Sequence, residues 1–318
     1  MKDTGGVYEI VLDLATAARF SGEIRRDEPM ANHTTFKVGG PADVWARPSA
    51  ECFPGFAAAL VEKARALQIP LFILGGGANL VVADRGIRGI VLDTTGWTGY
   101  GFSDPPGSGG GAVMTVRSGT AADKAAAAAA ERGWGGLEFL AGLPGSIGGA
   151  VWMNARCYGK QVSGPLLRTE ILDENLGRIW VPRVEEAFGY KKSPFQDRDV
   201  LILAAEFRLE KRAGEAIRAE MAGFRRDREE KGHYRFPSAG SVFKNNRGFG
   251  RPTGKIIDEL GLRGLRAGGA QVAPWHGNII INTGGATAGD ILRLTETLEE
   301  RVKRETGFDL EREIIFIR

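Results

Sequence analysis

The order of apolar and polar residues divides the first part of the chain into short strands and one helix. Four apolar stretches, "DVWARP", "LFIL", "NLVVAD" and "GIVLD", lie between residues 34 and 95, with a helical pattern near residues 51–67. Short apolar runs bounded by turns favour strands, so this region predicts a β-α-β-β-β arrangement. Residues 1–20 favour a short helix, which we expect to form a loosely held arm.

The next part predicts further strands and an alanine-rich helix. "AVMTVRSG" has the pattern of a strand, and "TAADKAAAAAAERGWGG" predicts a helix because consecutive alanines favour this conformation. We expect Thr120 to cap its N-terminus and Gly133 to end it. Ahead of these elements, "SDPPGSGGG" (Ser103 to Gly111) predicts a turn-rich insertion between strands.

The pattern changes after Glu210. Strands are predicted before it at 168–173, 178–182 and 200–209, with a short helix in "VEEAF". A charged helix over about 213–231 follows. The remaining predicted elements are a helix in "GKIIDELG", strands near 270 and 279, a helix from about Thr287 and a strand in "EREIIFIR". The last helix carries an apolar stripe on one face, which indicates packing against a sheet. The fold class is α+β, with a boundary near residue 210.

The composition limits the classes of function. The 318 residues include 42 basic and 39 acidic ones, a balance that argues against a nucleic-acid partner and suits an anionic small molecule. Cys52 and Cys157 make neither a disulfide framework nor a metal site, which fits a reducing cytosol. The N-terminus lacks a signal peptide, and no apolar run reaches the ~18 residues of a membrane span. We expect a cytoplasmic protein that binds neither nucleic acid nor membrane.

Three glycines follow the strand "LFIL" in the stretch "LFILGGGANLVVADRG". A dinucleotide-binding fingerprint is excluded because Leu80 occupies its third glycine position and a strand follows in place of a helix. A P-loop is excluded because no Gly-Lys-Ser/Thr follows. The stretch predicts a strand–glycine–strand turn whose backbone N–H groups can approach an anion. Taken alone, an ordinary turn explains it equally well.

A second glycine cluster is more specific. "GLEFLAGLPGSIGGAVWMNARCYG" (Gly136 to Gly159) contains glycines and a proline that suit neither a regular helix nor a strand. With "HTTFKVGGPAD" (His33 to Asp43), three glycine loops come from one region of the chain. Three loops that converge on one extended ligand with a pyrophosphate explain this better than three independent turns.

These motifs resemble the UDP-N-acetylenolpyruvoylglucosamine reductase family from about residue 30 to the end. The matching stretches are "NHTTFKVGGPAD", "LGGGANLVVAD", "LAGLPGSIGGAVWMNA", "PSAGSVFKN", "GLRGLRAGGAQV" and "LEREIIFI". The resemblance implies a two-lobed vanillyl-alcohol-oxidase/PCMH-type FAD-binding module followed by a smaller α+β substrate-binding domain. It resembles the shorter family type, which lacks an extra substrate-covering insertion. The implied parts are an N-terminal arm at 1–20, FAD-binding lobes at 21–95 and 96–210, and a substrate-binding domain at 211–318.

The resemblance also implies the chemistry. The reaction is the reduction of the enolpyruvyl ether of UDP-N-acetylglucosamine to UDP-N-acetylmuramate, with a hydride from NADPH passing through non-covalently bound FAD. This is a step of peptidoglycan precursor synthesis, and we expect a monomer. Whether NADH can replace NADPH stays open. The residues implied to bind FAD are Thr35, Gly39, Gly75, Gly76, Gly77, Ala78, Asn79, Leu80, Gly142, Pro144, Gly145, Ser146, Gly148 and Gly149.

Three residues are implied to act in catalysis. Ser241 matches the family's proton donor, although without its motif a turn serine would be the simpler interpretation. Glu313 matches the family's carboxylate, and its strand parity with Ile315 and Ile317 suggests that it points inward, where a partnerless carboxylate is costly. Lys191 stands where the family usually has arginine, so it keeps the charge but loses the bidentate fork. A solvated lysine is the alternative.

Substrate contacts are implied for Tyr190, Lys244, Asn245 and His276. The chain departs from the family at several of these motifs, since Asn246 replaces a proline and "APWHGN" replaces Ser-x-x-His-Ala-Asn. His276 could equally be a core histidine. "NARCYG" replaces Ala-Gly-Ala-Tyr-Gly, which puts Cys157 near the predicted flavin loop, where we expect a small buried residue and no covalent flavin link.

Two other functions remain possible on this reading. A flavin oxidase of the same fold would act on an alcohol or sugar and return electrons to oxygen, but it has no use for a proton donor such as Ser241. A non-catalytic nucleotide-sugar sensor would keep the glycine loops and lose Ser241 or Glu313, and both are present.

Overall fold

A computed structural model describes residues 4–103 and 111–318. The chain forms two compact units, each built from separated segments. Unit 1 comprises Met1–Arg26, Asp43–Gly76 and Gly89–Arg226, and unit 2 comprises Asp27–Ala42, Gly77–Arg88 and Asp227–Arg318. The predicted four-part division at 20, 95 and 210 stays a prediction. Most of the predicted turn-rich insertion, residues 104–110, lies outside the described residues.

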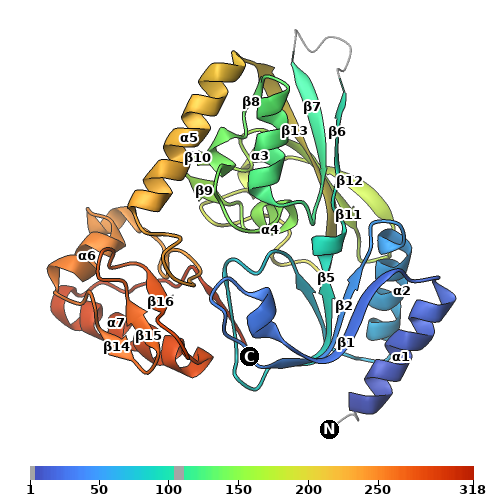
Figure 1. The fold of residues 1–318 in the computed structure, drawn as a ribbon, viewed down its shortest axis with the longest axis horizontal. Coiled ribbons are helices and arrows are strands. Elements are labelled where there is room, and N and C mark those ends of the chain that lie inside the picture. Colours follow the sequence, from blue (N-terminus) through green and yellow to red (C-terminus); the bar gives the residue numbers. More distant parts are fainter. Residues whose placement is uncertain (1–3, 104–110) are drawn as a thin grey trace. The chain divides into compact units, whose positions relative to one another are not determined.

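A four-stranded sheet and two helices form one part of unit 1 (Figure 1). The strand order is β1-β2-β5-β3, and β3 runs parallel to β5. Helix α2 packs on the sheet through Phe53, Phe56 and Leu60, which are fully buried with Val44 of β2. The elements are α1 (Thr4–Ala17), β1 (Gly22–Pro29), β2 (Pro41–Pro48), α2 (Phe53–Ala66), β3 (Leu71–Leu74) and β5 (Ile87–Asp93).

The predicted N-terminal helix is present, but it is not a loose arm. Val7 and Val11 of α1 are buried in the same apolar cluster as α2, and Val11 is completely inaccessible. Burying one valine side chain stabilises the folded state by roughly 1.5–3 kcal/mol relative to leaving it exposed to water. The local sequence does not show this contact, because the apolar residues of the segment pack against α2, which lies more than thirty residues further along the chain.

An antiparallel sheet forms the other part of unit 1. Its order is β12-β11-β13-β7-β6, and β8 also pairs with β13. Helices α3 and α4 share a buried core with this sheet. The elements are β6 (Tyr100–Ser103), β7 (Ala112–Arg117), α3 (Ala122–Glu131), β8 (Trp134–Gly135), α4 (Ile147–Trp152), β9 (Arg156–Cys157), β10 (Lys160–Gln161), β11 (Leu166–Leu172), β12 (Arg178–Pro182), β13 (Leu201–Lys211) and α5 (Gly214–Glu230).

The start of α3 differs from the prediction. Ala121 precedes the first helical residue and makes no side-chain cap. Thr120 instead donates its hydroxyl hydrogen to the carbonyl oxygen of Gly99 and accepts from the N–H of the same residue. Gly133 follows the helix with a φ of +71°, as expected of a terminating glycine. Thr120 therefore joins two loops in place of capping the helix.

Unit 2 contains a three-stranded antiparallel sheet and two helices. The order is β14-β15-β16, and α7 packs on it with Ile291, Leu294 and Leu298 buried. The C-terminal strand β17 pairs in parallel with β4 from the first third of the chain. The elements are β4 (Leu80–Val82), α6 (Thr253–Glu259), β14 (Arg266–Ala267), β15 (Ala270–Val272), β16 (Ile280–Asn282), α7 (Ala288–Thr306) and β17 (Ile315–Ile317).

Helix α7 begins with two caps. The helix starts where it was predicted, near Thr287, and Thr287 and Asp290 form a capping box there. In addition, the carboxylate of Asp84 accepts hydrogen bonds from the N–H groups of Ala288 (2.7 Å) and Gly289 (2.9 Å). A carboxylate at this position also interacts favourably with the helix dipole.

Short 3₁₀ helices complete the described fold: η1 (Met30–His33), η2 (Thr94–Gly96), η3 (Glu138–Leu140), η4 (Glu185–Ala187, in the predicted "VEEAF" helix) and η5 (Arg247–Phe249).

Candidate active site

The first glycine turn begins in unit 1 with Gly75 and Gly76, where the surrounding atoms leave no space for a side chain. A Cβ atom at Gly76 would lie 2.6 Å from the Cα of Gly145, and one at Gly75 would lie 2.6 Å from the Oγ of Ser146. The Ser146 hydroxyl oxygen accepts a hydrogen bond from the N–H of Gly76 at 3.3 Å, and it also caps α4 through the N–H of Gly149. The two glycine loops of unit 1 therefore pack backbone against backbone.

The continuation of this turn belongs to unit 2. Gly77 has a φ of +61°, and a Cβ there would lie 1.9 Å from the carbonyl oxygen of His33. Thr35 holds the turn by donating its N–H to Gly77 (3.1 Å) and its hydroxyl to Ala78 (3.4 Å). Within residues 4–103 and 111–318, the N–H groups of Gly77 and Ala78 have no acceptor. Such N–H groups fit the phosphate oxygens of a flavin pyrophosphate.

The other predicted cofactor glycines divide into packing and accessible positions. Gly148 is buried, and its Cβ position is 2.8 Å from the Cβ of Ser118. Gly39 is similarly close to Met30 and Val82. Pro144 and Gly149 are exposed, so they remain accessible to a ligand. Gly142 has a φ of +69° and donates its N–H to the carboxylate of Asp123.

In unit 2, Ser241 and Glu313 lie on adjacent hydrogen-bonded segments. Glu313 donates its N–H to the carbonyl oxygen of Val242, the residue after Ser241, at 2.7 Å. Two residues further, Lys244 donates its N–H to Glu311 at 2.8 Å. The side-chain amide of Asn79 donates to the carbonyl oxygen of Glu313 at 2.9 Å. The structure thus brings the two predicted catalytic residues together, next to a residue of the predicted cofactor turn.

The strand-parity argument for Glu313 is wrong. The strand β17 begins only at Ile315, and the chain bends at Ile314, which is 3% exposed. Glu313 itself is half-buried. A bend between the glutamate and the strand breaks the alternation on which the prediction relied. Its orientation is set by pairing with Val242, a contact far away in the sequence.

Asn278 fixes the backbone beside Ser241. Its Oδ1 accepts from the N–H of Phe243 (2.9 Å), and its Nδ2 donates to the carbonyl oxygen of the same residue (2.8 Å). The carbonyl oxygen of Asn278 accepts from the N–H of Val242 at 2.9 Å. The side chain is 2% exposed, so its hydrogen bonds are shielded from water. The sequence shows this residue only as the asparagine that ends "APWHGN", which does not reveal its structural role.

His276 is a neutral histidine with a defined tautomer. Its Nδ1 accepts from the N–H of Asn278 at 3.1 Å, so the ring proton lies on Nε2. Burial lowers the pKa of His276, and burial also lowers the pKa of its neighbour His233 to about 4. The two ring centroids are 6.4 Å apart. His276 can therefore offer one hydrogen-bond donor without carrying a charge at neutral pH.

The other predicted substrate contacts in unit 2 have protein partners. The ammonium group of Lys244 forms an ion pair with Glu311 at 2.5 Å. Asn245 is exposed, and its Oδ1 accepts from the N–H of Thr253 at the start of α6. These contacts order the segment that follows Ser241. Both residues stay predictions as substrate ligands.

In unit 1, Tyr190 and Lys191 occupy a tight turn. Gly189 and Lys192 exchange two backbone hydrogen bonds across it, at 3.0 and 3.2 Å. Lys191 has a φ of +58°, the left-handed conformation that the third position of a type II turn requires. The side chain of Gln196 donates to the Lys191 carbonyl oxygen at 3.1 Å. Tyr190 is 38% exposed.

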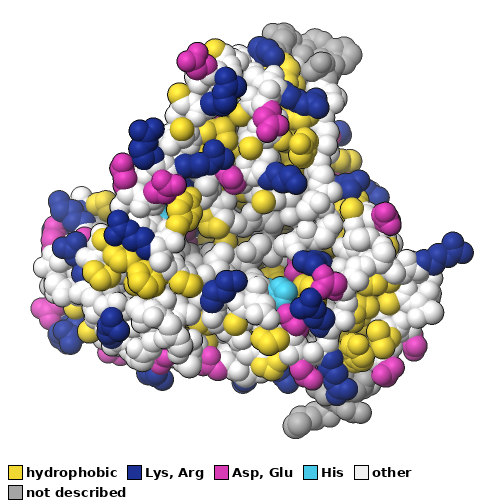
Figure 2. Space-filling model, in the orientation of Figure 1, with side chains coloured by type: hydrophobic (Ala, Val, Ile, Leu, Met, Phe, Trp, Pro, Cys, Tyr) yellow, Lys and Arg dark blue, Asp and Glu magenta, His cyan; other side chains and the backbone are white. Residues whose placement is uncertain are grey.

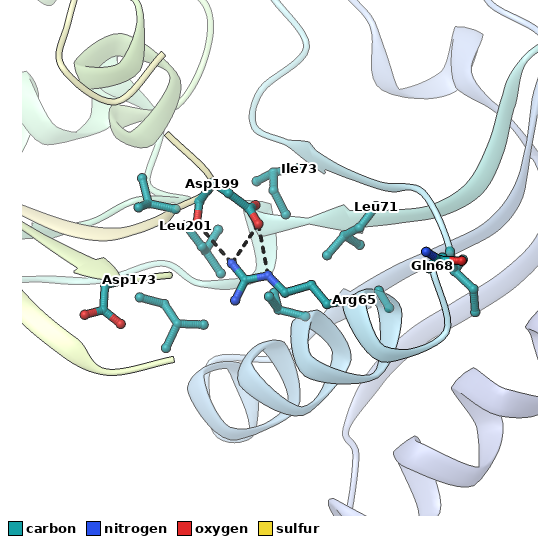
Figure 3. A pocket seen from close by; sticks show the side chains of 12 residues that line it. Arg65, Gln68, Leu71, Ile73, Asp173, Asp199 and Leu201 are labelled. Carbon is teal, nitrogen blue, oxygen red and sulfur yellow. Dashed lines mark hydrogen bonds and ion pairs between the residues drawn. The ribbon is translucent and has the colours of Figure 1, made fainter. Parts of the chain in front are cut away.

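A cavity of about 230 Å³ lies elsewhere in unit 1 and contains none of the predicted site residues. Figure 3 shows Arg65 pointing across it to Asp199. The guanidinium donates to the Asp199 carboxylate (2.9 Å), to the Asp199 carbonyl oxygen (3.1 Å) and to the Glu174 carbonyl oxygen (2.7 Å). These hydrogen bonds connect Arg65 of α2 to the loops that precede β12 and β13. They indicate a structural role for Arg65 and Asp199 beside the cavity.

Comparison with known proteins identifies the family. Residues 232–317 match the model of the UDP-N-acetylenolpyruvoylglucosamine reductase C-terminal domain, and residues 57–176 match an FAD binding domain. The UDP-N-acetylenolpyruvoylglucosamine reductase of Treponema pallidum (strain Nichols) is 39% identical over 92% of this chain and 93% of its own length. The chain belongs to the UDP-N-acetylenolpyruvoylglucosamine reductase family. The family match confirms the predicted fold class, an FAD-binding module followed by a C-terminal α+β domain.

Two further relatives support the same family. The reductase of Borreliella burgdorferi is 39% identical over 91% of this chain and 92% of its own length. The crystal structure of UDP-N-acetylenolpyruvylglucosamine reductase from Thermus caldophilus is 31% identical, with a TM-score of 0.74, over 94% of this chain and all of that one. The likeness therefore covers both family domains.

Among residues 4–103 and 111–318, no helix combines the length and the apolar character needed to cross a membrane. No cluster of three histidine, cysteine, aspartate or glutamate side chains suitable for a metal ion occurs among the same residues.

Proposed function

We propose that this protein catalyses the NADPH-dependent, FAD-mediated reduction of UDP-N-acetylglucosamine enolpyruvate to UDP-N-acetylmuramate, a step of peptidoglycan precursor synthesis. The observation that carries the proposal is the pairing of the Ser241 and Glu313 segments in a chain that also has the glycine turns of its family. When bound, FAD supplies the electron chemistry by accepting a hydride from NADPH and delivering it to the enol ether.

We assign FAD binding to the glycine loops. The proposed cofactor residues in unit 1 are Gly75, Gly76, Gly142, Pro144, Gly145, Ser146, Gly148 and Gly149. Those in unit 2 are Thr35, Gly39, Gly77, Ala78, Asn79 and Leu80. The N–H groups of Gly77 and Ala78 have no acceptor among the residues that the structure describes, and this supports the assignment because anionic oxygens are their natural acceptors. The glycines of the turn let it pack closely against neighbouring segments of the chain, which holds these N–H groups in position.

The chain must also activate a poor hydride acceptor. An enol ether accepts a hydride at its terminal carbon only if the neighbouring carboxylate is neutralised while negative charge develops on it. We propose that Lys191 supplies positive charge there. The Ser241 hydroxyl then donates a proton to the carbon that carries the carboxylate, which completes the lactyl ether. Glu313, on the segment bound to Val242, is the proposed carboxyl partner of this transfer.

Substrate recognition is assigned to side chains near these groups in the sequence. Tyr190, Lys244, Asn245 and His276 are the proposed contacts with the nucleotide sugar. The neutral Nε2–H donor of His276 supports its assignment, because it can bind a neutral or anionic oxygen of the sugar nucleotide. Figure 2 shows acidic and basic side chains mixed on the face drawn, which suits a small ligand better than a nucleic acid. We further propose a cytoplasmic monomer that binds no membrane.

Absorbance spectroscopy tests the proposed function in three steps. The purified protein should be yellow, and acid or heat should release the FAD. Anaerobic NADPH should bleach the flavin, and UDP-N-acetylglucosamine enolpyruvate should restore the colour. The same experiment with NADH measures the choice of nicotinamide. A protein that takes up no FAD would refute the proposal, and so would a reduced flavin that oxygen reoxidises rapidly while the enolpyruvyl substrate does not.

A further inference from the structure

Arg156 places a second cation beside the turn that carries Lys191. It lies in β9, and its guanidinium carbon is 5.6 Å from the centre of the Tyr190 ring. At this separation a guanidinium is attracted to the face of a tyrosine ring. Tyr190 immediately precedes Lys191, so Arg156 is next to the proposed carboxylate-binding turn. All of these residues belong to unit 1.

Arg156 has no acidic partner among the residues that the structure describes. Many arginines of unit 1 form ion pairs there, including Arg168 with Glu206 and Arg178 with Glu170. The Arg156 side chain is partly buried, and the contact found for it is with Tyr190. A half-buried guanidinium without a carboxylate is costly unless an anion arrives to pair with it. This feature indicates a binding role.

The segments of Arg156 and Tyr190 are tied together by a buried asparagine. Asn154 is 1% exposed, and its side-chain amide donates to the carbonyl oxygen of Gly189 at 2.8 Å. Its Oδ1 accepts from the N–H of Ser163 at 3.1 Å. The ribbon of β9 and β10, in which Arg156 pairs with Gln161, adds rigidity. The guanidinium and the turn are therefore held in one local framework.

Two of the departures of this chain from its family occur at these positions. Lysine replaces arginine at position 191, and arginine replaces glycine at position 156 of "NARCYG". An ammonium group binds a carboxylate as a point charge, whereas a guanidinium binds it with two parallel hydrogen bonds. A new arginine beside the site of the lost one would restore that fork.

We propose that Arg156 binds the carboxylate of the enolpyruvyl group and neutralises it as the enolate forms, with Lys191 supplying the second positive charge. This inference rests on the proposed function. It adds a carboxylate-binding residue that the family motif does not predict, and it explains how this chain can work with lysine at position 191. Tyr190 then serves as the surface that orients the Arg156 guanidinium.

Stopped-flow absorbance of Arg156→Met tests the proposal on the FAD-loaded enzyme. Pre-reduced enzyme is mixed anaerobically with a concentration series of UDP-N-acetylglucosamine enolpyruvate, which gives the rate and the affinity separately. We expect reoxidation to slow by about 10²-fold or more, the effect of removing one group that stabilises developing negative charge. Reduction by NADPH should keep its wild-type rate. Arg156→Lys should recover part of the loss, because it restores the charge without the fork.

Matched variants separate carboxylate binding from general electrostatics. Lys160→Met removes a neighbouring cation of the same β-ribbon, where Lys160 pairs with Glu220, and should leave both half-reactions unchanged. Lys191→Met should slow reoxidation, and Lys191→Arg should be tolerated. Binding of UDP-N-acetylglucosamine, which lacks the carboxylate, should be equal in wild type and Arg156→Met.

The outcomes are distinct. If wild-type reduced enzyme is not reoxidised by the enolpyruvyl substrate, the proposed function itself fails. If wild type reacts and Arg156→Met reoxidises at the same rate, the proposal for Arg156 is overturned. It is also overturned if Arg156→Met loses FAD or slows both half-reactions equally, since the residue then maintains structure. Slow reoxidation with normal reduction and normal UDP-N-acetylglucosamine binding supports it.

Discussion

Two regions carry the proposed chemistry, the glycine turn of unit 1 and the asparagine-bound segment of unit 2, and they are stabilised in opposite ways. In unit 1, the turn at Gly75 and Gly76 fits against Gly145 and Ser146 because side chains are missing. In unit 2, the segment from Ser241 to Phe243 keeps its course because the side chain of Asn278 is present and makes two buried hydrogen bonds. The glycine turn has no space for an added side chain. The asparagine-bound segment cannot lose the polar side chain of Asn278 without leaving buried backbone groups unpaired.

This difference separates two kinds of vulnerability. A substitution in the glycine turn acts through steric overlap, so its effect should grow with the size of the new side chain. A substitution of Asn278 acts through buried backbone groups that lose their hydrogen-bond partners. The size of the new side chain then matters less than its capacity to form hydrogen bonds. The predictions below test this contrast, beginning with the largest expected effect.

Ser241→Ala should affect one half-reaction only. Reoxidation by the enolpyruvyl substrate should slow by about 10²–10⁴-fold, the usual contribution of a general acid. Reduction by NADPH should be nearly unchanged, since the serine donates its proton after hydride transfer to the substrate. Stopped-flow measurement of both steps checks this, with Ser238→Ala as the control in the same segment. Equal slowing of both half-reactions would show that Ser241 is structural.

Asn278→Ala should destabilise unit 2 and disturb the serine at the same time. Two backbone groups of Phe243 lose their partners in a buried place, and each such loss costs about 1–3 kcal/mol. Urea unfolding should show the reduced free energy of unfolding, and reoxidation should slow as well. The exposed residue Asn246 supplies the control variant Asn246→Ala. Wild-type stability in Asn278→Ala would contradict the proposed contrast.

Gly76→Val should reduce FAD binding more than it reduces folding. The new side chain overlaps Gly145 and displaces the turn, and overpacking costs about 1–3 kcal/mol. If FAD binding has to restore the turn at this cost, its dissociation constant rises roughly 5- to 160-fold. Gly101→Val is the matched control, because a Cβ at Gly101 meets no atom within 4 Å. Flavin fluorescence titration of the apoprotein measures both variants. Normal FAD content in Gly76→Val would exclude this glycine from the cofactor turn.

Asp84→Ala should lower thermal stability without changing the chemistry. The variant removes two hydrogen bonds to the first turn of α7 and a favourable charge at the helix dipole, together worth about 1–2 kcal/mol. For a chain of this size the melting temperature should fall by roughly 2–4 °C. Asp309→Ala, at an exposed aspartate paired with Lys303, should have a smaller effect. An unchanged melting temperature in Asp84→Ala would show that the capping box alone suffices.

The smallest effect should be the acid sensitivity contributed by His233. The folded state keeps this imidazole neutral down to a pKa of about 4, whereas the unfolded chain takes up a proton below its ordinary pKa of 6.5. Protonation therefore favours unfolding, and stability should fall as the pH is lowered from 6.5 towards 4. His233→Gln should show a shallower fall in melting temperature over this range than wild type. Parallel curves would exclude His233 as a source of acid sensitivity.

The sequence predicted local elements better than contacts between distant segments. The helix at 51–67 and the strand at residues 71–74 follow from local apolar patterns, and so does the start of α7 near Thr287. Thr120 was misassigned because its polar partner, Gly99, lies in another loop that the local pattern does not reveal. Only tertiary structure decides whether a threonine caps a helix or joins two loops.

The candidate site shows the same limit. Glycine motifs indicated where side chains are excluded, and the structure explains the exclusion at Gly76 and Gly77. The pairing of Val242 with Glu313 joins residues about seventy positions apart and has no local signal. The parity argument for Glu313 failed for this reason. The positive φ of Lys191 was also invisible, because a lysine is an unusual choice for a left-handed turn position.

The parallel pairing of β4 with β17 has a consequence for how the chain is made. Leu80 pairs with Ile315, and Ala83 donates its N–H to Ile317 at 2.8 Å. The early strand must therefore wait for a partner that is synthesised more than two hundred residues later, an interval of roughly 10–50 s at ~5–20 residues per second. During this time the apolar edge of Leu80–Val82 lacks its final neighbour on the nascent chain. We expect unit 2 to become protease-resistant only after β17 has emerged from the ribosome, and unit 1 to fold earlier.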